Sequence, residues 1–213
     1  MTLATDWVTI SALATAAGTL VLAMATFASV RSANRAARVA EQSLLVGLRP
    51  LLMPARLEDP TQKVSFVEGK YLVAPGGSAV AEASDDAVLL AAPLRNVGSG
   101  IAVLHGWHFY PGRITRADHL EPEEFTRLTR DLYIAVGDLG FWQGTFRDPS
   151  APGFVEAREV IEAHGDWTVD LLYGDAEGGQ RMISRYAMLP REDGLWLASA
   201  GRHWNIDRDD PRY

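Results

Sequence analysis

The 213-residue chain contains no cysteine. This absence excludes disulfide bonds, thiolate metal sites, iron–sulfur clusters and cysteine nucleophiles. It suits a reducing compartment, although exported bacterial proteins without cysteine are also common. Familiar catalytic motifs are missing as well, since the sequence has no nucleophile elbow, no HExxH helix, no P-loop and no carboxylate pair at a meaningful spacing. We therefore expect no catalytic residue, no cofactor and no metal.

Charge is absent from residues 7–30, a run of 24 residues. As a helix this run would extend about 36 Å, which is enough to cross a hydrocarbon core of about 30 Å. A helix buried in a soluble domain would need apolar contacts on every side. A cleaved signal peptide would begin with positive charge, whereas the only charged residue among residues 1–6 is Asp6. We therefore predict an uncleaved transmembrane helix over about residues 7–30.

Positive charge is missing before this run and follows it directly as Arg31, Arg35 and Arg38. The positive-inside rule then predicts an outside N-terminus and a cytoplasmic C-terminal domain. The 4-then-3 spacing places the three arginines on one face of a helix, where their long side chains can reach lipid headgroups. We expect the helix to continue past the membrane to residue 46, and we expect the lipid bilayer to be its first partner.

Along the same helix a mostly small-residue seam, with Leu22 as one larger member, recurs at alternating spacings of four and three. Such a seam lets two helices approach closely, which predicts a homo-oligomer or a partner membrane protein. Composition alone also produces these matches in an alanine-rich helix. The small residues of the seam are Ser11, Thr15, Gly18, Ala25, Ser29, Ser32 and Ala36.

The pattern changes from helix to strand after Gly47, because Arg49 precedes a proline and is pushed toward extended geometry. Residues 47–213 then form a separate domain, after residues 1–46. Short alternating runs with Gly and Pro turns predict a mainly β fold, an Ig-like β-sandwich with one or two short helices near 121–128 and 154–164. The expected strands are 51–57, 64–66, 70–73, 78–83, 87–94, 101–110, 132–136, 141–142, 168–173, 181–189 and 195–198. Residues 202–213 are expected to be a solvated tail, with Trp204 docked on the domain.

The segment 94–110 combines residues typical of turns with two histidines in a predicted strand. Asn96, Gly98 and Gly100 tolerate positive φ and predict a turn between two strands. The glycines precede a strand rather than a helix, which argues against a phosphate-binding loop. His105 and His108 are three residues apart, so in a regular strand they point to opposite faces and cannot easily share a metal ion.

Strict alternation in the second of these strands predicts which side chains share a face. One face would hold Val103, His105, Trp107 and Phe109. A domain surface or pocket could form there with residues from other strands. Its candidate residues are Asn96, His105, Trp107 and Trp142.

The net charge of −7 is unevenly distributed. Residues 1–46 carry three arginines against Asp6 and Glu41, a net charge of +1, which leaves −8 for residues 47–213. An acidic domain repels phosphate backbones, so we expect no nucleic acid partner.

Three segments, RSANRAARVAEQSLLVGLRPLL, LRNVGSGIAVLHGW and VDLLYGDAEGGQRMISRY, together with the uncharged N-terminal run, resemble uncharacterised single-pass membrane proteins of actinobacteria. The resemblance implies a bacterial cell membrane and no particular activity. We predict a membrane-anchored protein whose cytoplasmic β domain is a protein-interaction module or an accessory subunit. The alternative is a membrane-held enzyme or small-ligand sensor with a pocket in the β domain.

Overall fold

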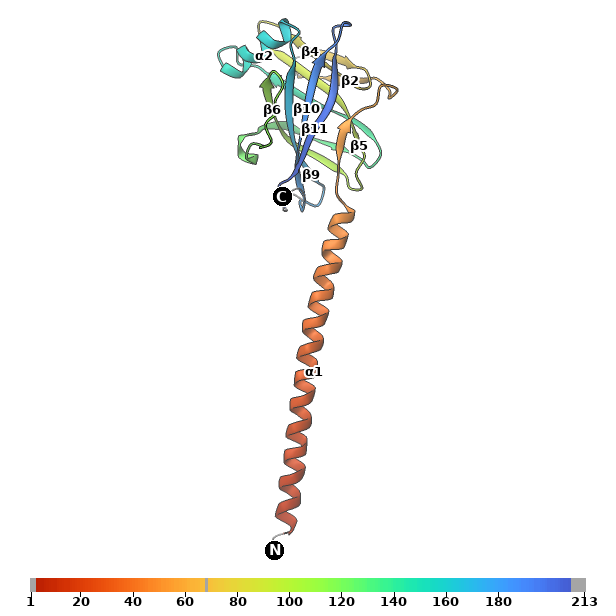
Figure 1. Ribbon diagram of the computed structural model, residues 1–213, viewed down its shortest axis with the longest axis vertical. Coiled ribbons are helices and arrows are strands. Elements are labelled where there is room, and N and C mark those ends of the chain that lie inside the picture. Colours follow the sequence, from red (N-terminus) through yellow and green to blue (C-terminus); the bar gives the residue numbers. More distant parts are fainter. Residues whose placement is uncertain (1–2, 68, 208–213) are drawn as a thin grey trace. The chain divides into compact units, whose positions relative to one another are not determined.

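The computed structural model describes residues 3–67 and 69–207. The chain divides into two compact units, Met1–Val46 and Gly47–Tyr213. The first is helical and the second is mainly β (Figure 1). A long N-terminal helix and a β domain are therefore confirmed. Each unit is described by itself below.

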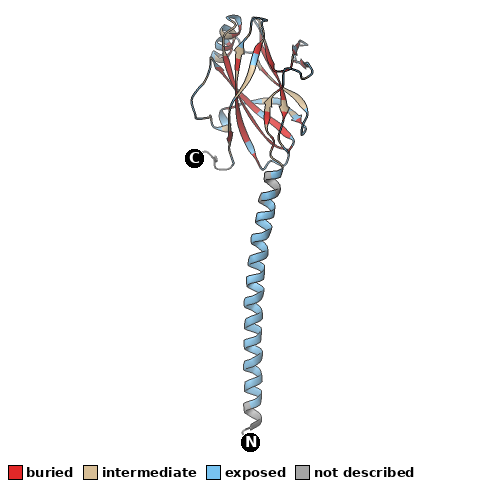
Figure 2. Cartoon of the chain, turned by 45° about the vertical axis from the view of Figure 1, so that its right-hand side comes forward, coloured by how far each residue is buried: buried red, intermediate tan, exposed pale blue. Residues whose placement is uncertain are grey.

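Helix α1 (Leu3–Gly47) is continuous over 45 residues. Its hydroxyl side chains do not interrupt it, because Thr15, Thr19 and Thr26 each donate a hydrogen bond to the carbonyl four residues earlier, at 2.8–2.9 Å. Within the stretch Trp7–Glu41, an 18-residue window reaches a mean hydropathy of 1.9, and none of the stretch is buried (Figure 2). By length and composition, this helix is able to cross a membrane.

Within residues 47–67 and 69–207, the β domain has one curled nine-stranded sheet and one small sheet, and every strand pairing there is antiparallel. The strand order in the large sheet is β1-β5-β4-β11-β10-β9-β6-β7, with β8 paired to β5, and β2 and β3 form the small sheet. The elements are β1 (Leu52–Pro54), β2 (Gln62–Ser65), β3 (Tyr71–Ala74), β4 (Ser78–Ala83), β5 (Val88–Asn96), β6 (Ala102–Pro111), the 3-10 helix η1 (Pro122–Glu124), β7 (Thr126–Ile134), β8 (Leu139–Phe146), α2 (Pro152–Glu162), β9 (Trp167–Asp175), β10 (Arg181–Pro190) and β11 (Trp196–Asn205).

The large sheet curls around the main hydrophobic core. Only two residue pairs, Ala79 with Trp196 and Ser78 with Leu197, join β4 to β11 within the described register. Core side chains come from both sides of this join, from β5 and β8 as well as from β6, β9 and β10. Aromatic rings fill the space between them, where neighbouring tryptophans lie 5.7–6.3 Å apart and belong to Trp107, Trp142, Trp167 and Trp196.

Strand β5 is buried on both faces, which explains its unbroken apolar sequence VLLAAPL. One face supplies Leu90 to the main core. The other face supplies Leu89 and Ala91 to a second cluster, where they pack with Val64 and Leu72 of the small sheet. The β2–β3 hairpin therefore covers the outer face of β5.

Most predicted strands are present. Two of them are longer than predicted, and the additional residues are mostly polar or exposed. Strand β7 begins at Thr126, six residues before the predicted start at 132, because its first residues, TRLTRD, are mostly exposed and give no apolar alternation. Strand β11 continues to Asn205 instead of ending at 198. Trp204, which the sequence places in the tail, is buried at the end of β11, as expected for a docked residue. Residues 208–213 of the predicted tail lie outside the described part of the chain.

A β-bulge between Leu104 and Gly106 changes the face assignment in β6. The extra residue shifts the alternation by one, so Leu104 joins Trp107 in the main core while His105 is exposed. The prediction that His105 shares a face with the core residues of β6 is therefore wrong.

The two glycines before β6 allow two segments to touch. Neither Gly98 nor Gly100 has positive φ, so the expected conformational role is not the reason for their presence. A Cβ atom on Gly98 would lie 2.3 Å from the Leu51 nitrogen, and one on Gly100 would lie 1.7 Å from the Leu48 carbonyl oxygen. The backbone of residues 48–51 occupies the space that side chains would need.

We expect Gly100→Ala to lower the free energy of unfolding of the β domain by about 3 kcal/mol or more, because a backbone must move to make room. The matched control is Gly165→Ala, whose Cβ would make an ordinary contact at 3.5 Å. Denaturant unfolding of the full chain in detergent measures both variants. Equal stability of Gly100→Ala and wild type would contradict the close approach.

Candidate functional site

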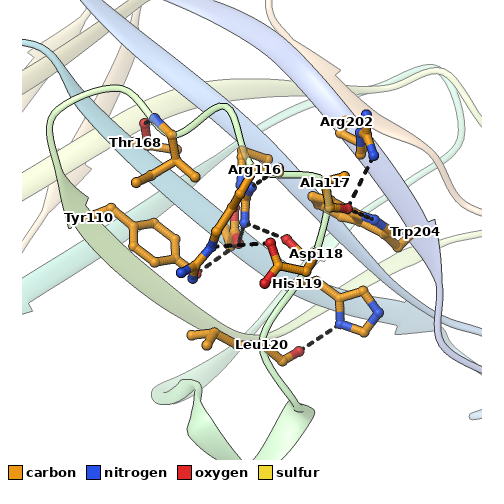
Figure 3. Close-up of polar contacts among 12 residues, drawn as sticks. Tyr110, Arg116, Ala117, Asp118, His119, Leu120, Thr168, Arg202 and Trp204 are labelled. Atoms are coloured by element: carbon orange, nitrogen blue, oxygen red, sulfur yellow. Dashed lines mark hydrogen bonds and ion pairs between the residues drawn. The ribbon is translucent and has the colours of Figure 1, made fainter.

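The outer face of β6, β9, β10 and β11 is the part of the β domain where charged groups converge. Alternate residues of β10 face the main core, among them Met182 and Tyr186, so Arg181 and Arg185 lie on the opposite face. Segment 112–125 crosses this face between β6 and β7 (Figure 3). Two hollows open on the same face, one lined by Arg181 and the other by Arg185.

A buried ion pair lies at the centre of this face. Asp170 and Arg185 are directly opposite each other in the register of β9 and β10, and their exposed fractions are 0 % and 3 %. Arg185 donates from Nε to Oδ1 of Asp170 at 2.8 Å and from Nη2 to Oδ2 at 2.7 Å. Tyr110 donates a hydrogen bond to the same carboxylate at 3.2 Å, and burial raises the pKa of Tyr110, which stays a neutral donor. The Asp170 charge is therefore fully compensated.

The same guanidinium holds segment 112–125 on the sheet. Arg185 donates to the carbonyl oxygens of Arg116 at 2.9 Å and of Asp118 at 3.2 Å. The carbonyl of Ala117 accepts from Trp204 Nε1 and from Arg202 Nη1, both at 3.1 Å (Figure 3). Removing one member of a buried ion pair typically lowers the free energy of unfolding by about 3–5 kcal/mol. Because Arg185 also holds two carbonyls of segment 112–125, the position of this segment on the sheet depends on the ion pair.

The first hollow is a cleft of about 330 Å³ beside the β6 bulge. Phe125 and Leu172 supply apolar surface, and His105, Arg127 and Asp131 supply polar groups. The cleft is at the small end of the range for small-molecule sites. Gly106 lets Phe125 pack closely against β6, since a Cβ on residue 106 would lie 3.0 Å from Phe125 Cβ.

The charged groups of the cleft differ in their partners. Arg181 is paired with Asp207 at 2.7 Å, and the hydrogen bond from Arg181 lowers the pKa of Asp207. Within residues 3–67 and 69–207, neither Arg127 nor Asp131 makes an ion pair or a side-chain hydrogen bond. Glu123, which also lines the cleft, likewise has no such partner among the described residues. The cleft therefore offers one cation, Arg127, and two carboxylates beside an apolar wall.

His105 at the cleft edge titrates in an altered environment. Neighbouring protein atoms withdraw part of its ring from water, and this desolvation lowers the pKa of His105 below its usual value. The charge of Asp131 acts in the opposite direction, and the charges of Arg181 and Arg127 lower the pKa further. The ring is therefore neutral at pH 7, with one nitrogen able to donate and one able to accept.

The structure separates the four residues predicted to form one surface or pocket. Only His105 lines the cleft. Trp107 and Trp142 lie in the main core with exposed fractions of 3 % and 0 %. Asn96 is buried in the turn before β6, where Nδ2 donates to the carbonyls of Gly100 at 2.7 Å and Ile134 at 3.0 Å. Its role is to hold a turn.

A serine–histidine contact that the sequence did not indicate lies inside the domain. Ser184 Oγ is 2.5 Å from His203 Nδ1 and 2.8 Å from Tyr173 Oη. The exposed fraction of Ser184 is 0 %. A nucleophile must reach a substrate, so this serine belongs to a structural hydrogen-bond network.

The predicted positions in α1 are exposed. Arg31, Arg35 and Arg38 line one shallow hollow on the side of the helix, as their spacing predicts. Ser11 and Thr15 line another, together with three alanines, Thr19, Val8 and Leu20. In the described part of the chain, no group of three or more His, Asp or Glu residues is placed to hold a metal ion.

Comparison with known proteins adds little to this geometry. No protein-family model matches the chain, and no curated protein matches it. Among solved structures, a crystal structure bearing the name ApaA protein, from Bordetella pertussis, is 10 % identical, with a TM-score of 0.24, and the match covers 78 % of this chain and 98 % of that one. A likeness of this size supports no conclusion about fold or function.

We expect the pKa of His105, followed by NMR as the chemical shift of its ring protons, to lie below about 6.5. Arg127→Gln should raise it, Asp131→Asn should lower it further, and Arg130→Gln, which leaves the neighbours of His105 in place, should leave it unchanged. Because the unfolded chain protonates His105 first, this residue lowers stability as the pH falls through about 6.5. A pKa above 6.5, or one that ignores both substitutions, would contradict the assignment.

Proposed function

We propose that this chain is a single-pass protein of a bacterial cell membrane, with its N-terminus outside and its β domain in the cytoplasm, where the domain binds a protein partner or acts as an accessory subunit. Helix α1 carries the proposal. Its large apolar side chains are exposed, with fractions of 73 % for Trp7, 69 % for Leu22 and 70 % for Phe27. A lipid environment removes the cost of exposing them to water.

The sidedness rests on the arginines at the end of the apolar stretch. Arg31, Arg35 and Arg38 form a cluster on one side of α1, while no Lys or Arg precedes the stretch. This asymmetry favours a cytoplasmic C-terminal domain. The seam of small residues that includes Ser11, Thr15 and Gly18 supports association with a second helix, either a second copy of this chain or a partner membrane protein.

The β domain supports an interaction role through its surface. Near the buried Asn96 turn, four apolar side chains are exposed to 44–62 % and belong to Val97, Ile101, Tyr133 and Val136. Asn96 brings their segments together, because it bonds to Gly100 and Ile134 while the Gly137 N–H donates to the Asn96 carbonyl. Apolar side chains gathered on one surface are typical of protein contact sites. We also infer an Ig-like β-sandwich, supported by the two halves of the curled sheet that face each other across the main core.

Topology is tested with C-terminal fusions. A fluorescent protein that folds in the cytoplasm should fluoresce, and alkaline phosphatase should be inactive. Replacing Arg31, Arg35 and Arg38 by Gln, together with Thr2→Lys and Thr5→Lys, should move part of the population to the opposite orientation. A matched variant with Arg56, Arg113 and Arg202 replaced by Gln should keep the original orientation. Phosphatase activity in the unmodified chain would overturn the sidedness.

The interaction role is tested by capturing the tagged full chain from detergent-solubilised membranes. A protein at fixed stoichiometry should co-purify with the wild type and with Val155→Asp, an exposed change on α2. Tyr133→Asp should abolish its recovery, because burying a new carboxylate at an apolar contact costs several kcal/mol, roughly a 100-fold loss of affinity or more. Equal recovery of the partner with Tyr133→Asp and Val155→Asp would exclude the surface formed by Val97, Ile101, Tyr133 and Val136 as the contact site.

The His105 cleft favours a second candidate function, a sensor of a small zwitterionic ligand. Arg127 could bind a carboxylate and Asp131 an ammonium group, with Phe125 and Leu172 contacting an apolar side chain. Repeating the His105 titration with added L-phenylalanine tests this candidate. A shift of the pKa in the wild type that Arg127→Gln removes would support it, and an unchanged titration would exclude it.

A further inference from the structure

The second hollow on the outer face is a groove of about 270 Å³ that gathers four arginines in an acidic domain. Its wall is segment 113–116, which contributes Arg113 and Arg116. Its floor is formed by β10 and β11, which contribute Arg185 and Arg202. The remaining floor residues are small, and they are Ala187, Ser199, Ala200 and Gly201. A ligand can therefore approach the sheet closely between the arginines.

Three of these four arginines lack a buried counter-ion. Arg185 is neutralised by Asp170. Arg116 lies 3.5 Å from Asp118, whose side chain is 72 % exposed, and that carboxylate is largely screened by water. Arg202 donates to a neutral carbonyl, and Arg113 makes no hydrogen bond or ion pair among the described residues. The groove thus holds an excess of positive charge, although residues 47–213 carry a net charge of −8.

The arrangement of the arginines has an electrostatic cost, which Asp170 offsets at Arg185 but not at Arg202. Arg185 and Arg202 are cross-strand partners in the register of β10 and β11. Like charges directly opposite each other destabilise a sheet. The register shifts next to this pair, where Gly201 is the additional residue in β11. A bound anion would relieve the repulsion between the guanidinium groups.

Three of the groove arginines are held against aromatic rings. Arg185 lies 4.9 Å from the Trp204 ring centre and 5.4 Å from the Tyr110 ring centre. The Arg202 guanidinium lies 5.9 Å from the Trp204 ring centre, and Arg116 lies 5.2 Å from the Tyr110 ring centre. Arg116 also donates to the Tyr110 hydroxyl at 3.3 Å. Stacking and hydrogen bonding restrict these side chains, so less entropy is lost when they bind a ligand. Arg113 stays available from the wall.

We propose that this groove binds a phosphoryl group, the terminal phosphate of either a soluble phosphate compound or a phospholipid headgroup. A carboxylate is planar and one guanidinium fork saturates it. A tetrahedral phosphoryl group carries up to two negative charges and three outer oxygens, which accept hydrogen bonds from guanidinium groups on both the wall and the floor. Arg113 and Arg202 bind the group from the two sides, and Arg185 keeps the wall in place.

The test is calorimetric titration of the full chain in a neutral detergent with inorganic pyrophosphate. Arg113→Gln and Arg202→Gln should each weaken binding at least about tenfold, the loss expected for a charge-assisted hydrogen bond. Arg56→Gln, an exposed arginine outside the groove, should bind as the wild type does. Arg113 has no hydrogen-bond or ion-pair partner to lose among residues 3–67 and 69–207, so an unchanged thermal unfolding midpoint shows that its variant is folded. Pyrophosphate binding that is absent, or equal in wild type and Arg113→Gln, would overturn the proposal.

Two further titrations fix the chemistry and the source. Citrate carries comparable negative charge on carboxylates, and citrate binding as tight as that of pyrophosphate would overturn the assignment to a phosphoryl group. Dihexanoyl phosphatidic acid below its micelle concentration presents the same group on a lipid. Tighter binding of this lipid than of pyrophosphate assigns the site to a headgroup, and the reverse order assigns it to a soluble phosphate compound, so either order supports the phosphoryl site.

Discussion

The Asp170–Arg185 pair is the interaction on which the functional surface of the β domain depends. Both side chains are buried on the outer face of the sheet, and neither would be tolerated there alone. Once paired, Arg185 still has donors left, and these hold the backbone carbonyls of Arg116 and Asp118. A single guanidinium therefore connects three parts of the chain, namely strands β9 and β10 and the segment between β6 and β7. The cleft at His105 and the groove at Arg113 both use this segment or its continuation as a wall. Both hollows therefore depend on the hydrogen bonds from Arg185 to this segment.

A second constraint acts where the chain enters the domain. The Leu52 N–H donates to Tyr173 Oη and the Leu52 carbonyl accepts from Tyr186 Oη, so β1 is held by two core tyrosines as well as by β5. Burial raises the pKa of both tyrosines, which keeps them protonated and able to donate. Asn96 adds an acceptor for the Leu51 N–H. Hydrogen bonds from buried polar side chains therefore fix the position of β1 at the edge of the sheet. Hydrogen bonds are directional, whereas apolar packing is not.

Much of the fold could be predicted from the sequence because apolar periodicity reports burial. Strand β4 was predicted at its observed bounds, and α1 was visible as an uncharged run. Polar strands such as the start of β7 left no such signal. The site was less accessible to prediction, since one bulge at His105 reversed the faces of β6 and separated His105 from Trp107 and Trp142. The arginine groove brings together residues near positions 113, 185 and 202. Because these positions are far apart in the sequence, no local sequence pattern predicts that they lie side by side.

The hydrogen bonds of the entry segment have a mechanical meaning. A pull applied to the chain at Gly47 reaches Arg49 first, whose carbonyl accepts from Ser99 and Gly100. It then reaches Leu51 and Leu52, which are bonded to Asn96, Val97 and the two core tyrosines. The bonds follow one another along a few residues, so tension is shared among several of them and is passed to β5, β9 and β10 together. A domain fastened in this way resists extraction from its N-terminal end. Residues 202–206 are fastened by other means, since Arg202 and Trp204 donate to the Ala117 carbonyl and the Ile206 N–H donates to the Arg181 carbonyl.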